Sequence, residues 1–220
     1  MKFDAIVSNP PYSKSWEGKN NTILINDVRY SPAGVLAPIQ KSDLAFTMHM
    51  LYHLSETGTC AIVEFPGVLY RGNAEKKIRE YLIKNNFVDT VIQLPANLFF
   101  GVGIATCIIV IKKNKKDNNI LFVDASEEYE KKGDKNKLED ENQNRIVNAY
   151  KERKEEQYFS KLVSNDEVLA NGANLSVSSY VEKEDKREVI DIVKLNEEIQ
   201  TLQSEIFTLN TEIANKIASL

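Results

Sequence analysis

The sequence predicts an α/β protein with a mainly parallel sheet, extended by a charged excursion and a C-terminal coiled-coil helix. Three observations predict this class. Short apolar runs alternate with segments of helical periodicity over residues 1–125, as in sheets built from strand–helix–strand crossovers. A stretch rich in Lys, Glu, Asp and Asn follows. The end of the chain carries a regular heptad of Ile and Leu, which is typical of paired helices.

The first elements follow from local pattern. Residues 3–8 predict a parallel-type strand that ends in the motif described below. The polar loop over residues 13–41 is long enough to be a lid or a partner-binding segment. Residues 43–55 carry apolar side chains at helical spacing, with Gly58 just beyond the predicted helix end. The other predicted elements are a strand over 60–63, a helix over 74–86, and strands over 88–94, 106–111 and 120–123.

The second half of the chain changes in composition. We expect one domain over residues 1–125, a charged helix/loop excursion and cap over 126–181, and a C-terminal coiled-coil helix over 182–220. Between residues 127 and 157 there are few aliphatic anchors, whereas residues 158–181 regain apolar content and predict a small cap.

The C-terminal helix has apolar residues alternately three and four apart. Ile occupies one seam position and Leu the other, a pattern that favours two helices side by side. An amphipathic helix folded back on its own domain is the alternative. The seam consists of Ile192, Leu195, Ile199, Leu202, Ile206, Leu209 and Ile213.

Composition argues against several classes of protein. The net charge of −4 argues against a protein that wraps DNA alone, because nonspecific affinity comes from neutralised phosphates. The sequence shows no signal peptide and no apolar run of the ~20 residues a membrane span needs, so we expect a cytoplasmic protein without membrane contact. Cys60 and Cys107 lie in apolar runs and are interpreted as reduced core residues. Two lysine clusters are interpreted as solvated loops, with contacts to phosphate groups as the alternative: Lys112, Lys113, Lys115 and Lys116, and Lys131, Lys132, Lys135 and Lys137.

The tetrapeptide Asn9-Pro10-Pro11-Tyr12 directly follows the first strand and is the strongest candidate site. Asn9 offers a carbonyl acceptor at the carboxyl end of a strand, where open α/β sheets bind ligands. The two prolines give a rigid edge without backbone N–H donors. Tyr12 supplies an aromatic face for a planar base. Acceptors beside a stacking face suit the amino group of a nucleobase, whereas the alternative is a polar turn after a buried strand.

This motif resembles the catalytic motif of amino-methyltransferases that use S-adenosylmethionine, above all the adenine-N6 DNA methyltransferases. Further segments resemble the modification (M) subunit of type I restriction-modification systems, and the resemblance runs from Phe3 to about Val181. The Leu-Pro-x-Asn-Leu-Phe run is its most specific part. These segments are Ser42 to Phe46, Gly58 to Val63, Pro66 to Gly72, Gln93 to Cys107 and Phe122 to Ser126.

The resemblance implies a C-terminal half of a Rossmann-like S-adenosylmethionine-dependent methyltransferase sheet, with residues 1–125 as a partial methyltransferase domain. It also implies an antiparallel last strand, so the closing strand pair could include a hairpin. The implied reaction is methyl transfer from S-adenosyl-L-methionine to N6 of adenine in DNA. Implied partners are the specificity (S) and restriction (R) subunits, DNA through the complex, and a second M subunit.

Site residues follow from the same resemblance. Asn9, Pro10, Pro11 and Tyr12 are the implied catalytic motif. Phe99 or Phe100 would stack on the second face of the base, with core packing as the alternative. Asn9, Asp43 and Phe46 are implied to lie beside the cofactor, and Phe46 could equally be a core residue.

The glycine-rich cofactor loop of this family lies upstream of the motif, and no such loop precedes Asn9. Gly101-Val102-Gly103 leads into a strand-like run and is interpreted as a tight turn or bulge. We therefore expect the N-terminal domain and the glycine-rich loop to be absent, the cofactor site to be incomplete in this chain, and its activity alone to be doubtful.

Two other functions remain open at this stage. One is a noncatalytic remnant or assembly module that binds a specificity subunit, and the other is a protein or RNA methyltransferase that shares the motif. A metal site is not predicted, because Met50 follows His49 and breaks the H-E-x-x-H pattern that the spacing of His49 and His53 would otherwise allow.

Overall fold

The structure, a computed structural model, describes residues 1–99, 101, 103–184 and 191–219 of the 220-residue chain. The chain forms two units, Met1–Lys183 and Glu184–Leu220. Each unit is described by itself.

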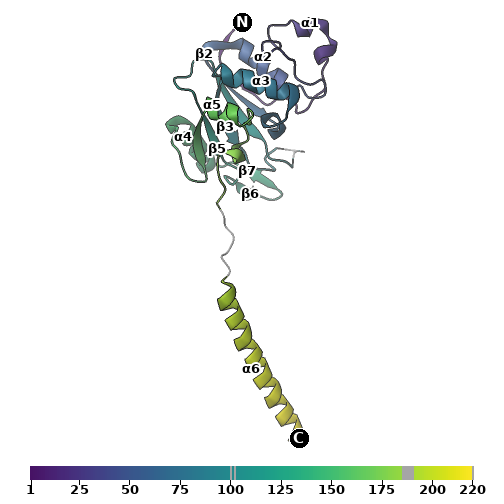
Figure 1. Cartoon of the computed structure of the whole chain (residues 1–220), viewed down its shortest axis with the longest axis vertical. Coiled ribbons are helices and arrows are strands. Elements are labelled where there is room, and N and C mark those ends of the chain that lie inside the picture. The colour runs from purple at the N-terminus through teal and green to yellow at the C-terminus, as the bar shows by residue number, and fades with distance from the viewer. Residues whose placement is uncertain (100, 102, 185–190, 220) are drawn as a thin grey trace. The chain divides into compact units, whose positions relative to one another are not determined.

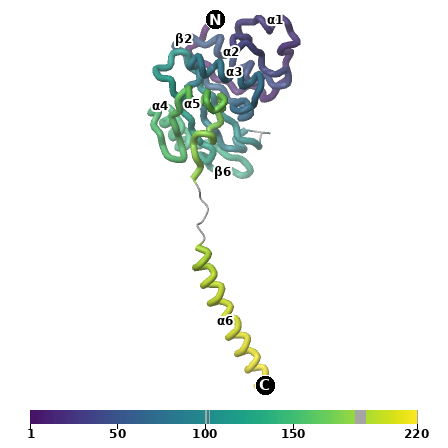
Figure 2. Tube along the Cα trace, viewed as in Figure 1, coloured from purple at the N-terminus to yellow at the C-terminus, as the bar shows by residue number. Residues whose placement is uncertain are grey.

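The first unit follows an α/β order along the chain (Figure 1). Its first half contains β1 (Phe3–Ser8), η1 (Gly18–Asn20), α1 (Thr22–Ile25), α2 (Asp43–His53), β2 (Leu54–Glu64), η2 (Pro66–Leu69), α3 (Asn73–Lys84), β3 (Val88–Gln93), β4 (Cys107–Lys112) and β5 (Asn119–Asp124). Its second half contains β6 (Glu130–Lys132), β7 (Lys135–Lys137), α4 (Asp140–Glu152), β8 (Ser160–Ser164), α5 (Asn165–Ala170) and η3 (Val177–Ser179). The segment over residues 13–41, with η1 and α1, runs along the outside of the unit (Figure 2).

A six-stranded sheet has the order β1-β2-β4-β3-β5-β8. β1 pairs with β2 in parallel, and β3 pairs with β5 in parallel. β4 lies between β2 and β3 and is antiparallel to both, and β8 is antiparallel to β5. The predicted α/β class is therefore confirmed. The closing strand pair, β3 and β4, is a hairpin.

Helices cover both faces of this sheet. On one face, Leu44 of α2, Ile78 of α3 and Val168 of α5 belong to one buried cluster with the strand residues Ile62 and Ile109. On the other face, a smaller cluster joins α4 and residues 159–162 to β3 and β5; it contains Ile92, Leu94, Leu121, Val123, Ala125, Ile146 and Phe159. β5 is buried on both faces, which explains why its inner residues Ile120 to Val123 are all apolar, whereas β3 also contains the buried polar residues Asp89 and Thr90.

The boundary between α2 and β2 differs from the prediction. The helix ends at His53, and β2 begins at Leu54 and not at Cys60. Gly58 lies inside β2, at the irregular register where Phe3 pairs with Leu54 and Ala5 with Thr59. A Cβ at Gly58 would lie 2.7 Å from Leu54 Cδ1 and 2.9 Å from the Phe3 carbonyl oxygen, so close packing requires glycine there.

The charged stretch is an integral part of the first unit. β6 and β7 form a two-stranded hairpin, and α4 begins with a capping box between Glu139 and Asn142. The chain then returns as β8, which extends the main sheet. The buried Arg79 ties α3 to the end of this region, because its Nε donates to the Ala173 carbonyl at 2.7 Å and its Nη1 to the Val68 carbonyl at 2.9 Å.

β1 forms an open edge of the sheet. Its only strand partner among the described residues is β2. Phe3 and Val7 on this strand are 44% and 85% exposed. An edge strand with one unpaired side and exposed apolar side chains is a surface on which a further strand can pair.

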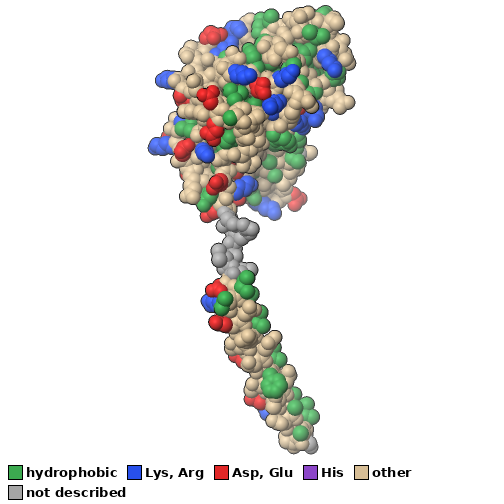
Figure 3. Space-filling model, viewed as in Figure 1, with side chains coloured by type: hydrophobic (Ala, Val, Ile, Leu, Met, Phe, Trp, Pro, Cys, Tyr) green, Lys and Arg blue, Asp and Glu red, His purple; other side chains and the backbone are tan. Residues whose placement is uncertain are grey.

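The second unit contains α6 (Ile192–Ala218). Asp191 caps its N-terminus by accepting hydrogen bonds from the backbone N–H groups of Val193 and Lys194. The predicted seam residues Ile192 to Ile213 are all exposed, and Figure 3 shows apolar side chains spaced along the visible face of the helix. In the described part of the chain, no helix is both long and apolar enough to cross a membrane.

Candidate active site

The motif Asn9-Pro10-Pro11-Tyr12 begins directly after β1. Ser8, the last residue of β1, pairs with Ile62 of β2, so the parallel strands β1 and β2 end at the same edge of the sheet. Pro10 is buried, whereas Asn9 and Pro11 are exposed. The buried Pro10 therefore anchors the motif in the fold, while Asn9 lies at the surface.

Tyr12 holds the Asn9 side chain. The Tyr12 hydroxyl donates a hydrogen bond to Asn9 Oδ1 at 2.8 Å. A carbonyl oxygen has two lone pairs, so Asn9 Oδ1 retains one acceptor position for a ligand. Burial, with Glu64 and Cys107 nearby, raises the pKa of Tyr12, so its hydroxyl remains a donor at neutral pH.

The chain after Tyr12 is anchored to the start of α2. Ser13 has a left-handed backbone, with φ of 49°. Its N–H donates to Asp43 Oδ1 at 2.7 Å, and the Ser42 N–H donates to the Lys14 carbonyl at 3.0 Å. Asp43 is only 1% exposed, and its Oδ2 has no hydrogen-bond partner in the part of the chain that the structure describes. The predicted residues Asn9, Tyr12 and Asp43 are thus brought together, with Asp43 fixing the exit of the motif.

Glu64, which the sequence analysis did not single out, is fully buried at the end of β2. Its Oε1 accepts a hydrogen bond from Thr47 Oγ1 at 2.8 Å, and none of the described residues forms a hydrogen bond with its Oε2. Burial, with a smaller contribution from the nearby carboxylates Asp43 and Glu75, raises the pKa of Glu64 to about 8 even though the Thr47 hydrogen bond lowers it. Glu64 is therefore mostly protonated at neutral pH. The signal in the sequence is an acidic residue that directly follows the apolar run Cys60 to Val63.

The raised pKa of Glu64 predicts a pH-dependent stability. The folded chain keeps a proton at Glu64 that the unfolded chain loses above its ordinary pKa of 4.5, so stability falls as pH rises from about 4.5 to about 8. The limiting slope for one such group is about 1.4 kcal/mol per pH unit. Glu64→Gln keeps an acceptor for Thr47 and removes the titration. Urea unfolding at several pH values should show that the advantage of Glu64→Gln over the wild type grows towards pH 8; a constant difference would contradict the assignment.

The aromatic candidates lie in different settings. Phe46, on α2, is half-buried and packs against the larger core cluster. Phe99 is half-buried after β3, and its carbonyl accepts a hydrogen bond from Lys135 Nζ at 3.3 Å. Phe100 and Val102 lie outside the described residues, and Gly101 occupies a turn between β3 and β4 with φ of 71°.

The lysine clusters are not simply solvated loops. Lys115 Nζ donates to the Val88 and Asn119 carbonyls at 2.7 and 2.8 Å, and burial lowers its pKa to about 8. Lys112 pairs with Asp89 at 3.4 Å, and Lys113 donates to the Leu54 carbonyl at 2.8 Å. The prediction of solvated side chains is wrong for these three lysines, because Lys112 ends β4 beside Asp89 of β3 and the short β4–β5 connection holds Lys113 and Lys115 against strand ends.

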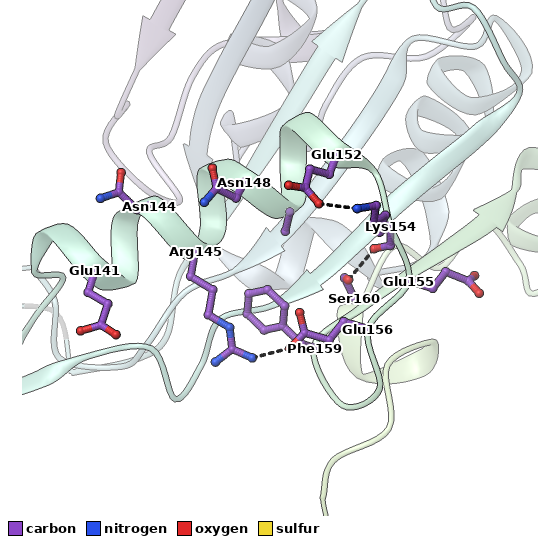
Figure 4. A pocket seen from close by; sticks show the side chains of 11 residues that line it. Glu141, Asn144, Arg145, Asn148, Glu152, Lys154, Glu155, Glu156, Phe159 and Ser160 are labelled. Carbon is purple, nitrogen blue, oxygen red and sulfur yellow. Dashed lines mark hydrogen bonds and ion pairs between the residues drawn. The ribbon is translucent and has the colours of Figure 1, made fainter.

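A groove of about 740 Å³ lies between α4 and residues 154–160 (Figure 4). None of the predicted site residues lines it. The Arg145 side chain extends from α4 over the Phe159 ring and pairs with Glu128 at 2.5 Å and with Glu156 at 2.7 Å. Lys154 pairs with Glu152 at 2.9 Å. Both cations of the groove are therefore neutralised by the chain itself.

An open α/β sheet with an antiparallel strand inside it, and an Asn-Pro-Pro-Tyr motif at the carboxyl end of a parallel strand, agree with part of a Rossmann-like methyltransferase fold. The chain belongs to the N-6 DNA methylase family, whose model matches residues 1–189. The Type I restriction enzyme MpnII methylase subunit of Mycoplasma pneumoniae is 45% identical over 219 residues, which are 99% of this chain and 40% of that protein. The MjaVIII methylase subunit of Methanocaldococcus jannaschii is 32% identical, over 93% of this chain and 36% of that protein.

Solved structures agree with this assignment. The methyltransferase subunit of a type I restriction-modification system from Streptococcus thermophilus superimposes with a TM-score of 0.79 at 43% identity, covering 82% of this chain and 38% of that chain. The chain thus spans about two fifths of the length of the relatives it matches.

Proposed function

We propose that this chain is the part of a type I modification subunit that holds the target adenine and directs methyl transfer to its N6 atom in DNA. The observation that carries this proposal is the Asn9 carboxamide, held by Tyr12 at the carboxyl end of β1 with one acceptor position free. Family membership supports DNA as the substrate, and the type I methylase relatives support the assembly.

The proposed mechanism needs no general base. The N6 lone pair of adenine is delocalised into the ring, which makes the amino group a poor nucleophile. Asn9 Oδ1 and the Pro10 carbonyl would accept the two N6 hydrogens and favour a more tetrahedral nitrogen, so positioning and electrostatics would provide the rate enhancement. The base must leave the double helix to reach these groups. Tyr12 would stack on one face of the base, and Phe99 or Phe100 on the other.

S-adenosyl-L-methionine supplies a methyl group on a sulfonium sulfur when it is bound. Asp43 fits such a cofactor, because its buried Oδ2 has no partner and a carboxylate suits a cation or a hydroxyl donor. We place Asp43 beside the cofactor while its Oδ1 holds the motif loop through Ser13. Asn9 would lie at the boundary between cofactor and base. Phe46 packs against the core, and its cofactor role rests on the resemblance alone.

The exposed edge of β1 is the proposed junction with the rest of a methyltransferase sheet. Its open side and the exposed Phe3 and Val7 fit strand pairing with the polypeptide that forms the other three fifths of the relatives. That polypeptide would supply the glycine-rich cofactor loop.

The proposed partners follow from the type I class. α6 would pair with a helix of the specificity subunit, which would provide DNA sequence recognition; the restriction subunit and a second M subunit would complete the complex. A net charge of −4 agrees with DNA contact through the assembly. DNA as substrate and the two thiol cysteines fit action in the cytoplasm.

A chimeric enzyme tests the proposal. In the chimera, this chain replaces the matching 219 residues of the Mycoplasma pneumoniae subunit, and the partner subunits of that system are supplied. We expect transfer of labelled methyl groups from S-adenosylmethionine to DNA. A soluble, assembled chimera without transfer would favour a noncatalytic assembly module that binds a specificity subunit. Methylation of protein or RNA in place of DNA would favour a protein or RNA methyltransferase.

A further inference from the structure

The segment after β3 contains the residues that, by the proposed function, face the second side of the target base. It runs from Pro95 to Phe99 as a turn without strand or helix pairing, and Asn97 has a left-handed backbone with φ of 56°. Such a loop does not hold an aromatic ring in a fixed position by itself. Something else in the fold must restrain it.

The β6–β7 hairpin provides this restraint from almost forty residues further along the chain. Asn136 Nδ2 donates to the Ala96 carbonyl at 2.8 Å, and the Asn136 backbone N–H donates to the Asn97 carbonyl at 3.2 Å. Lys135 Nζ donates to the Phe99 carbonyl at 3.3 Å. Two adjacent residues of β7 thus bind three of the four carbonyl groups between Ala96 and Phe99.

Apolar packing fixes the same segment. Leu98 and Leu138 both pack against the smaller core cluster, which includes Ile92 and Leu94 of the preceding chain. Lys132 and Lys137 pair with Glu139 at the start of α4, so the hairpin is itself tied to a helix. The hairpin is therefore braced on one side by α4 and bonded on the other side to the Ala96–Phe99 segment.

We propose that the β6–β7 hairpin is a support for the base-facing segment, and that Asn136 is a positioning residue for methyl transfer. Asn136 does not contact the base; it holds the backbone from which Phe99 extends. This inference rests on the proposed function, because it needs the Ala96–Phe99 segment to face the extruded base. Part of the charged excursion would thus serve methyl transfer by positioning the base-facing segment.

The test uses Asn136→Ala and Asn136→Asp in the chimeric enzyme. Asn136→Asp keeps the shape of the side chain but turns a negatively charged oxygen towards the Ala96 carbonyl oxygen, so its loss should be at least as large as that of Asn136→Ala. At saturating DNA and cofactor, we expect the single-turnover rate of methyl transfer to fall about 3–10-fold, as for the loss of one hydrogen bond, with the KM for DNA within about twofold of the wild type. Asn114→Ala, an exposed Asn in the β4–β5 turn, is the matched control and should leave the rate unchanged.

A double-mutant cycle with Phe99→Ala separates positioning from general destabilisation. If Asn136 acts through this segment, the loss caused by Asn136→Ala should shrink or disappear in the Phe99→Ala background. A rate equal to wild type in Asn136→Ala, or fully multiplicative losses in the cycle, would overturn the inference. If the unsubstituted chimera transfers no methyl group to DNA, the proposed function itself fails, which is a distinct result.

Discussion

Asn9→Ala is expected to lower the rate of methyl transfer by about 10²–10³-fold in the chimeric enzyme, as is typical for the loss of one oriented polar group at a reacting centre. The alanine lacks the acceptor that would hold an N6 hydrogen, and the Tyr12 hydroxyl loses its partner. Asn9 is exposed and follows β1, so its side chain does not stabilise the core. The measurement is the single-turnover rate of label transfer to DNA.

The controls for Asn9→Ala separate chemistry from binding. DNA affinity of the assembled enzyme should persist, because phosphate contacts made by the assembly dominate it. Tyr12→Phe keeps the ring for stacking and removes only the hydroxyl, so its loss should be much smaller than that of Asn9→Ala. Wild-type turnover in Asn9→Ala would show that the motif is only a turn after β1.

The double substitution Ile199→Asp and Ile206→Asp is expected to abolish association through α6. Both side chains lie in the apolar seam and are 44% and 58% exposed. Burying one Ile or Leu contributes roughly 1.5–3 kcal/mol, so five or more seam residues outweigh the repulsion between acidic side chains along the helix. We expect the purified wild-type chain to pair with a second copy, and in the cell with a specificity subunit. Light scattering of the chain alone and co-purification with that subunit measure the two associations.

Ser204→Asp and Thr211→Asp form the matched control on the opposite side of α6. They add the same charge outside the seam, at positions where both hydroxyls donate only to backbone carbonyls of the same helix. This control should associate like the wild type. If the wild-type chain is a monomer and the seam variant still captures the specificity subunit, α6 does not mediate assembly.

Much of the fold follows from local sequence. β1, β3, β4 and β5 were predicted because each is a short run of mainly apolar or β-branched residues, and α3 because its apolar residues recur at helical spacing. The start of β2 was missed, because Leu54 to Thr57 has no strand pattern and its conformation depends on packing against β1.

In the charged region, the strands β6, β7 and β8 could not be predicted from local sequence. β8 has only Leu162 and Val163 as aliphatic residues, and its position is set by pairing with β5, about forty residues earlier in the chain. The β6–β7 hairpin is likewise short and charged, and its hydrogen bonds to Ala96 and Asn97 are long-range contacts. Sequence patterns depend on residues that are close along the chain, so they do not predict strand or hydrogen-bond partners about forty residues away.

Some residues of the candidate site were likewise predicted from local sequence, and others were not. Asn9 and Tyr12 were identified from the motif, since two prolines fix the local backbone whatever surrounds them. Glu64 was missed, because an acidic residue is normally exposed and its burial results from the packing of α2 and β4 against β2. Asp43 was placed near the cofactor by resemblance, and the structure adds its hydrogen bond to Ser13, which no spacing rule indicates.

The most direct test of the account is the identity of the methylated nucleoside. DNA modified by the chimeric enzyme would be digested completely and analysed by mass spectrometry, alongside DNA from the Asn9→Ala variant. The account predicts N6-methyldeoxyadenosine from the chimera and almost none from the variant. A methylated cytosine, or an equal yield of N6-methyldeoxyadenosine from both enzymes, would contradict the claim that this chain holds the target adenine through Asn9.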